Sequence, residues 1–264
     1  MKAGDGGIML AMDTATRRAA LALGTGAGKL IAERSWECGH RPGQELLATL
    51  DDLLSRSGVV PGQLAVVVVG TGPGAFTGLR VGLSTAKALA HGLGCPIVGI
   101  PSTLALAEAA WRLAGAGVPR DLTVILPAGP RDRYVASYRW PVGGADRKAE
   151  SEAGSGPDGD EGAAEPQERG EPRLLAAAEA AGALAAGGLI VAVDLAAGEG
   201  IDERSLDIGR QAQEGLGRAL LRIGRRRVAR GAVDDVALLV PAYVTLPRGI
   251  AAERGAIGWS SDRR

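Results

Sequence analysis

The sequence predicts an α/β fold in which a mostly parallel sheet is covered by helices. Residues 65–69 include four consecutive valines, a run typical of a strand that is buried on both faces. A glycine-rich turn follows it, and residues 76–93 then repeat their apolar side chains at helical spacing. Strands and helices continue to alternate through residue 113, and this alternation favours a layered architecture.

The N-terminal residues predict three strands before the first helix. Apolar runs at 8–12, 18–23 and 30–34 are separated by an acidic turn and a glycine-rich turn. This order is how actin-like and sugar-kinase-like domains begin. In the nucleotide-binding members, a glycine after the acid lets phosphate approach, whereas here Ala15 adds a methyl group two residues after Asp13. We therefore interpret Asp13 as an acid that caps a turn.

One helix is expected before the valine strand in the sequence, and another after it. Residues 44–57 place their leucines on one helical face, and residues 76–93 form the second helix. Residues 97–100 are the next expected strand. Ser102 is then the expected N-cap of a helix over residues 103–113.

The second half of the chain is expected to contain a further sheet and a surface insertion. Strands are predicted at 122–126 and 133–140, as partners of each other. Residues 142–171 contain almost nothing to bury, so they predict an acidic insertion or flexible loop. Beyond it we expect an alanine-rich helix, a strand and part of another helix, at residues 174–186, 189–194 and 215–223.

A cluster of arginines follows the last of these helices. Such a cluster is typical of a solvated helix end, and the alternative is a contact with RNA phosphate. Its members are Arg222, Arg225, Arg226, Arg227 and Arg230.

Composition excludes several classes of function. The 264 residues suit one large or two modest domains, and the zero net charge argues against binding nucleic acid through a broad basic field. Cys38 and Cys95 lack metal-ligand spacing, which indicates a reduced cytosolic protein. Two histidines are too few for a His-rich metal site. No apolar segment is long enough to span a bilayer, so no membrane partner is expected.

The expected helix over residues 76–93 has two apolar faces and a narrow polar stripe. Gly78, Gly82, Ala86 and Ala90 recur at four-residue spacing, which would let another helix approach closely. The polar stripe consists of Arg80, Ser84, Lys87 and His91. Two interpretations fit this pattern: a central helix inside its own domain, or a helix that buries one face against another protein.

Residues 72–82 read Gly-Pro-Gly-Ala-Phe-Thr-Gly-Leu-Arg-Val-Gly, and residues 85–90 read Thr-Ala-Lys-Ala-Leu-Ala. This wording closely resembles the signature of the bacterial TsaB proteins, also called YeaZ. Residues 8–16 resemble the opening strand and loop of that family. The resemblance covers roughly residues 8–110, and Pro241-Ala242-Tyr243 is similar to the wording that closes many of its members.

The resemblance implies a two-lobed actin-like or sugar-kinase-like (ASKHA) fold, with lobes at residues 1–110 and 111–264. It also implies a non-catalytic scaffold in the synthesis of N6-threonylcarbamoyladenosine at adenosine 37 of tRNA. In the family, this subunit pairs with the catalytic subunit TsaD, and the ATPase TsaE joins the assembly. ATP and metal are therefore expected on the partners, with no cofactor on this chain, and tRNA is reached through the complex in the cytoplasm. Self-association of the isolated chain is left open.

Pairing in the family uses two helices from each protein, which correspond here to residues 44–57 and 76–93. The implied partner-binding residues are Leu46, Leu47, Leu50, Leu54, Phe76, Leu79, Arg80, Leu83 and Lys87. Any cofactor contact would fall on the first loop and the glycine-rich turn, at Asp13, Thr14, Gly72 and Gly74.

Three other functions are alternatives to this scaffold. A small-molecule kinase of the same superfamily needs a glycine-containing phosphate loop at 13–16. A protease, an older suggestion for the family, finds little support in two histidines and no metal motif. Residues 70–75 fit a G-x-G-x-x-A dinucleotide pattern, but no acid after the following strand could hold a ribose.

Overall fold

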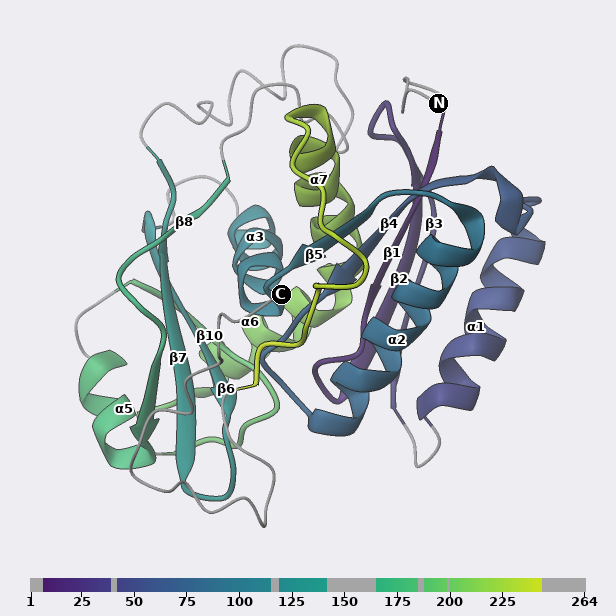
Figure 1. Cartoon of the computed structure of the whole chain (residues 1–264). Helices are drawn as coiled ribbons and strands as arrows, with labels where there is room; N and C mark the ends of the chain where they lie inside the picture. The colour runs from purple at the N-terminus through teal and green to yellow at the C-terminus, as the bar shows by residue number, and fades with distance from the viewer. Residues whose placement is uncertain are drawn as a thin grey trace, which may run out of the picture.

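The structure is a computed structural model that describes residues 7–38, 42–114, 119–141, 165–184, 188–198 and 200–243. These residues form two five-stranded mixed sheets, and helices α3, α6 and α7 lie between the sheets (Figure 1). This arrangement confirms the predicted α/β class with two sheets flanked by helices.

The first sheet has the strand order β3-β2-β1-β4-β5. β1 pairs antiparallel with β2 and parallel with β4, and β4 pairs parallel with β5. The valines of β4 are almost completely buried, as predicted for a strand covered on both faces. The strand bounds are β1 (Ile8–Asp13), β2 (Arg18–Thr25), β3 (Leu30–Glu37), β4 (Leu64–Gly70) and β5 (Ile97–Ile100).

Helices cover both faces of this sheet because successive strand residues point to opposite sides. Val67 and Val69 join a core with the leucines of α1 (Pro42–Arg56) and with α2 (Phe76–Leu93). Val66 and Val68 face the other way, toward α3 (Ser102–Ala114) and α7 (Leu216–Ala229). A short 3-10 helix, Pro61–Gln63, precedes β4.

Helix α2 has the bounds predicted from the sequence. It ends where Gly94 takes a left-handed conformation, with φ of 62°, and donates its N–H to the carbonyls of Ala90 and His91. Glycine adopts this conformation without a Cβ penalty, so a glycine at this point ends the helix.

The second sheet has the order β10-β6-β7-β8, and β9 also pairs with β7. Its strands are β6 (Asp121–Pro127), β7 (Asp132–Arg139), β8 (Gln167–Glu168), β9 (Arg173–Ala176) and β10 (Leu189–Ala192). β6 and β7 are antiparallel partners, as predicted. β8 pairs with the end of β7, so the C-terminal end of the segment predicted as an insertion or loop forms a strand. Residues 142–164 of that prediction lie outside the described residues.

The C-terminal half differs from the sequence-based expectations at three places. The helix expected from residue 174 begins only at α5 (Ala177–Leu184), because Leu174 and Leu175 pair with β7 as part of β9. Helix α6 (Glu203–Glu214) was not predicted; Asp202 caps it by accepting a hydrogen bond from the N–H of Ser205 at 2.7 Å. Helix α7 extends through most of the arginine cluster, which was expected to follow the helix.

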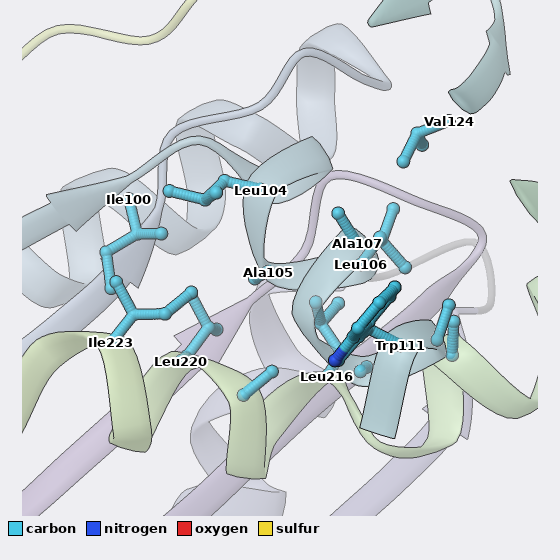
Figure 2. Close-up of a cluster of buried hydrophobic side chains, with 14 of the residues drawn as sticks. Ile100, Leu104, Ala105, Leu106, Ala107, Trp111, Val124, Leu216, Leu220 and Ile223 are labelled. Carbon is cyan, nitrogen blue, oxygen red and sulfur yellow. The ribbon is translucent and has the colours of Figure 1, made fainter. Parts of the chain in front are cut away.

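A buried core around α3 joins the two sheets (Figure 2). Leu106 and Leu216 are fully buried in it, and the rings of Trp111 and Trp140 stack with centroids 4.8 Å apart. Polar contacts also join the two halves. The side chain of Gln213 donates to Thr16 Oγ1 and to Asp194 Oδ1, both at 3.0 Å.

The end of the described chain returns to the first sheet. Asp234 bridges to Ile97, and its carboxylate accepts the N–H of Gly99 at 2.7 Å. Residues 234–243, called the C-terminal strap below, then run toward the start of α2, and α7 packs on the same sheet from its other face. Within the described residues, no helix combines the length and apolar character needed to cross a membrane.

Candidate functional site

The loop after β1 is filled by the protein's own backbone. Asp13 is fully buried; its Oδ2 accepts a hydrogen bond from Ser102 Oγ at 2.5 Å, and its Oδ1 accepts the N–H of Ala15 at 2.7 Å. Burial raises the pKa of Asp13, and the hydrogen bonds from Ser102 and Ala15 act in the opposite direction. The carboxylate therefore faces the interior, and it caps the turn at Ala15 as its position suggested.

Ser102 links this carboxylate to the glycine-rich turn. The Gly72 N–H donates to Ser102 Oγ at 3.0 Å, and the Ser102 N–H donates to the Gly72 carbonyl at 2.7 Å. The prediction of Ser102 as an N-cap was wrong, because Ser102 is the first residue of α3 and the Pro101 carbonyl accepts the first helical hydrogen bonds. Its hydroxyl is committed to Asp13 instead.

Glycines allow the turn and helix α2 to lie directly on this loop. An added Cβ at Gly70 would lie 1.7 Å from Asp13 Oδ2, and one at Gly74 would lie 1.9 Å from the Ala15 carbonyl oxygen. At Gly78 it would lie 2.1 Å from the Thr14 carbonyl oxygen. Thr14 Oγ1 also donates to the Gly78 carbonyl at 2.6 Å.

The candidate cofactor contacts are thus packed against one another. Asp13, Thr14 and Gly72 are buried, and Gly74 lies against Ala15. Within the described residues, no three His, Cys, Asp or Glu side chains gather where they could hold a metal ion.

The small-residue stripe of α2 faces inward. Gly78, Gly82, Ala86 and Ala90 are all buried by the chain itself, which corrects the expectation that another helix could approach along them. A second row of small residues lies on the outer face of the same helix. Ser84, Ala88 and Gly92 follow one another at four-residue spacing, and all three are exposed. Thr77, Arg80 and His91 of α2 are also exposed. These six residues are called the outer face of α2 below.

Most leucines expected at a partner interface are core residues. Leu46, Leu50 and Leu54 of α1 and Leu79 and Leu83 of α2 are at most 6% exposed. Leu46, Leu50, Leu54 and Leu83 belong to the core between the first sheet, α1 and α2, and Leu79 is buried beside Gly72 of the glycine-rich turn. The assignment of these five leucines to a partner surface is therefore corrected. Leu47 differs from them because it is 56% exposed, beside the buried leucine row of α1.

The remaining expected partner residues are held by the C-terminal strap. Arg80 stacks on the Phe76 ring, with its guanidinium carbon 3.9 Å from the ring centroid, and its Nε donates to the Tyr243 hydroxyl at 3.1 Å. The Phe76 and Tyr243 rings lie 5.2 Å apart. Lys87 Nζ donates to two strap carbonyls, those of Ala237 at 3.2 Å and Leu239 at 3.1 Å.

Tyr243 is a contact residue that the sequence does not predict, although it lies in the Pro-Ala-Tyr motif. The strap also presents apolar side chains outward, since Leu238 is 60% and Val240 is 68% exposed. The outer face of α2 therefore lies between the exposed Leu47 of α1 and an apolar strap.

The arginine cluster is partly buried, so its interpretation as a solvated helix end was wrong. Glu108 of α3 is fully buried and lies within salt-bridge distance of Arg112, Arg222 and Arg226. Arg227 donates to the carbonyl of Gly99 at 2.9 Å. These contacts attach α7 to α3 and β5.

The sequence of this chain is similar to those of several known proteins. A family model described as "TsaD: tRNA N6-adenosine threonylcarbamoyltransferase" matches residues 40–153. The tRNA threonylcarbamoyladenosine biosynthesis protein TsaB of Escherichia coli K12 is 34% identical over 145 residues, 55% of this chain and 61% of that protein. The TsaB protein of Haemophilus influenzae is also 34% identical, over 40% of this chain and 44% of its own length. The chain thus spans about three fifths or less of these relatives.

A solved structure extends the likeness to most of the fold. The solved structure of YeaZ from Pseudomonas aeruginosa superposes with a TM-score of 0.63 over 90% of this chain and 100% of its own. At 22% identity, this match shows a shared fold.

Proposed function

Because the chain belongs to the TsaB (YeaZ) family, we propose that it takes part in forming threonylcarbamoyladenosine in tRNA. In this proposal it is a non-catalytic scaffold that pairs with a TsaD-like catalytic subunit. A TsaE-like ATPase and tRNA join through the complex, and ATP and metal bind the partner subunits. The chain works in the cytoplasm, where tRNA is modified.

The observation that carries the scaffold role is the closed loop after β1. A kinase of this superfamily needs space between that loop and the glycine-rich turn for the phosphates of ATP. Here the Gly74 and Gly78 backbones occupy that space, at distances that exclude even a methyl group. The buried Asp13 is bonded to Ser102 and has no open side from which to orient a metal or a phosphate.

The outer face of α2 supports the choice of interface. Its exposed row of small residues, Ser84, Ala88 and Gly92, would let a partner helix approach the α2 backbone. Side chains of that partner helix would pack into the shallow groove that these small residues leave. Leu47 and the apolar strap on either side supply surface whose burial favours association. When the partner is absent, the same face can pair with a second copy of the chain.

The test is replacement of the native TsaB in a bacterium that requires it. The chain should restore threonylcarbamoyladenosine in total tRNA, measured by mass spectrometry of nucleoside digests, when its own TsaD-like subunit is supplied with it. Lack of the modified nucleoside, despite expression of both proteins and their recovery as a folded complex, would overturn the proposal.

Self-association is a separate measurement on the isolated chain. Light scattering should give a dimer for the wild type and a monomer for Ala88→Arg, because Ala88 is exposed on the outer face. Substitution of Leu83 is unsuitable here, because Leu83 is 5% exposed and a charge at this position would disrupt the core. A dimer that survives Ala88→Arg would place self-association elsewhere.

A further inference from the structure

On the opposite face of the first sheet from α1 and α2, a pocket is lined, among the described residues, by several cationic side chains and by no acidic one. It lies between the β2–β3 turn and α7. Four of its nine lining residues are cations, namely Lys29, Arg218, Arg222 and Arg225, and none is acidic. This is called the basic pocket below.

The turn and the helix are built to bring these cations together. Arg218, Arg222 and Arg225 recur at positions i, i+4 and i+7 of α7, so they share one helix face. Gly28, at φ of 94°, lets the guanidinium of Arg225 lie against the turn, since an added Cβ would be 3.2 Å from its carbon. Lys29 follows on the exposed rim.

The helix dipole does not account for this arrangement. Cations are favoured in the last turn of a helix and disfavoured in the first, yet Arg218 lies in the first turn of α7. It is held there by Glu33 on β3, with Arg218 Nε 2.8 Å from a carboxylate oxygen. Glu108 lies 3.5 Å from Arg222 on the α3 side. Both carboxylates lie outside the pocket lining, and they fix the direction of the guanidinium groups without filling the space between them.

The donor set suits phosphate groups. Guanidinium groups present planar pairs of N–H donors that match phosphate oxygens, and an ammonium adds a point charge. The Thr25 hydroxyl accepts the N–H of Lys29 at 3.1 Å and keeps its own hydrogen as a donor. The three arginines extend over about 10 Å of helix, which exceeds a single phosphate and suits linked phosphates along a strand.

We propose that the basic pocket binds consecutive backbone phosphates of tRNA. The choice of tRNA rests on the proposed function, and the phosphate chemistry rests on the pocket. The chain would then contribute its own contact to the RNA on the sheet face opposite α1 and α2, so one subunit could hold a protein partner and the RNA at once.

The test uses the full-length chain and fluorescently labelled unmodified tRNA. Binding is followed by anisotropy over a salt titration, because each neutralised phosphate adds about 0.7 to 0.9 to the slope of log affinity against log salt. The variant Lys29→Gln/Arg225→Gln should lose about one to two units of slope and bind at least about tenfold more weakly at low salt.

A matched control removes the same charge elsewhere. Arg56→Gln/Arg210→Gln alters two exposed arginines on α1 and α6 and should bind tRNA like the wild type. The single variant Lys29→Gln, at an exposed residue, should retain the wild-type melting temperature and lose about one unit of slope.

Three results would overturn the inference: no salt-dependent tRNA binding by the wild type, equal losses in the pocket and control variants, or equally effective competition by inorganic phosphate at the same phosphate concentration. The last would indicate a small phosphate compound as the ligand. Failure of the proposed function appears separately, as absence of modified tRNA with the wild-type chain, and it leaves the anisotropy result unaffected.

Discussion

Thr14 and Gly82 are in such close contact that α2 has no room for a side chain at residue 82. An added Cβ would lie 2.2 Å from Thr14 Oγ1 and 3.4 Å from its Cβ. Helix α2 therefore packs directly against the loop that carries Asp13. This contact explains why the position of α2 and the closure of the loop depend on each other.

The first prediction tests the contact between Thr14 and Gly82 by comparing two glycine substitutions in α2. Gly82→Ala should destabilise the protein by about 1 to 3 kcal/mol, because overpacking displaces either the loop or the helix. Gly92→Ala should be neutral or stabilising by up to about 1 kcal/mol, since a Cβ there meets nothing within 4 Å and alanine favours the helix. Urea unfolding of both variants measures the difference. Equal stabilities would contradict the described contact.

The second prediction concerns pH and the buried Asp13. Burial raises the pKa of Asp13 in the folded state above its unfolded value of about 3.9. The folded protein therefore loses stability as the pH rises from the unfolded pKa through the folded pKa, because the buried carboxyl group must then ionise. The hydrogen bond from Ser102 opposes this loss by stabilising the ionised carboxylate. Ser102→Ala should therefore cost on the order of 1 to 3 kcal/mol near neutral pH and less in acid.

Urea midpoints of wild type and Ser102→Ala between about pH 4 and pH 8 measure this trend. Ser84→Ala, at an exposed serine on α2, serves as the control and should show a pH-independent difference. If the loss of stability caused by Ser102→Ala became larger as the pH falls, the predicted direction of the pH dependence would be wrong.

The third prediction separates the scaffold from a kinase. Isothermal titration of the chain with ATP and Mg²⁺ should give no binding heat, because the space beside Asp13 is filled. Ala15→Gly, which restores the glycine expected in a phosphate loop, should also fail to bind, since Gly74 and Gly78 still occupy the site. Saturable ATP binding that is lost in Asp13→Asn would favour the kinase.

The fourth prediction concerns the strap. Arg80→Ala removes the stacking on Phe76 and the hydrogen bond to Tyr243, which together should weaken attachment of residues 237–243 by about 1 to 2 kcal/mol. Hydrogen exchange at the Ala242 amide, which donates to the Thr71 carbonyl, should accelerate. Tyr243→Phe keeps the ring contact and loses only the hydroxyl, so its effect should be smaller. Unchanged exchange in Arg80→Ala would contradict the contact.

Local sequence signals predicted the first sheet and α2 well. The four valines, the glycine-rich turn and Gly94 act through nearest neighbours, so the strand and both ends of the helix could be predicted from the sequence. The burial of Gly78 and Gly82 could not, because a stripe of small residues looks the same whether a loop or another protein covers it. The roles of Ser102 and Tyr243 depend on partners far away in the chain.

The arginine cluster shows the same limit in electrostatic terms. A run of arginines predicts a solvated surface when no carboxylate is near in sequence, but Glu108 lies more than a hundred residues before Arg226. Only the tertiary fold brings them together. Residues 173–176 illustrate a further limit, because pairing with β7 overrides their helical preference.

The account depends most directly on the outer face of α2 as the surface that binds a TsaD-like subunit. Size-exclusion chromatography with light scattering should give a stable complex of the wild-type chain with that subunit. Ala88→Arg should abolish the complex, and Ala178→Arg, at an exposed alanine on α5, should leave it intact. A complex that forms equally well with both variants would contradict the central claim.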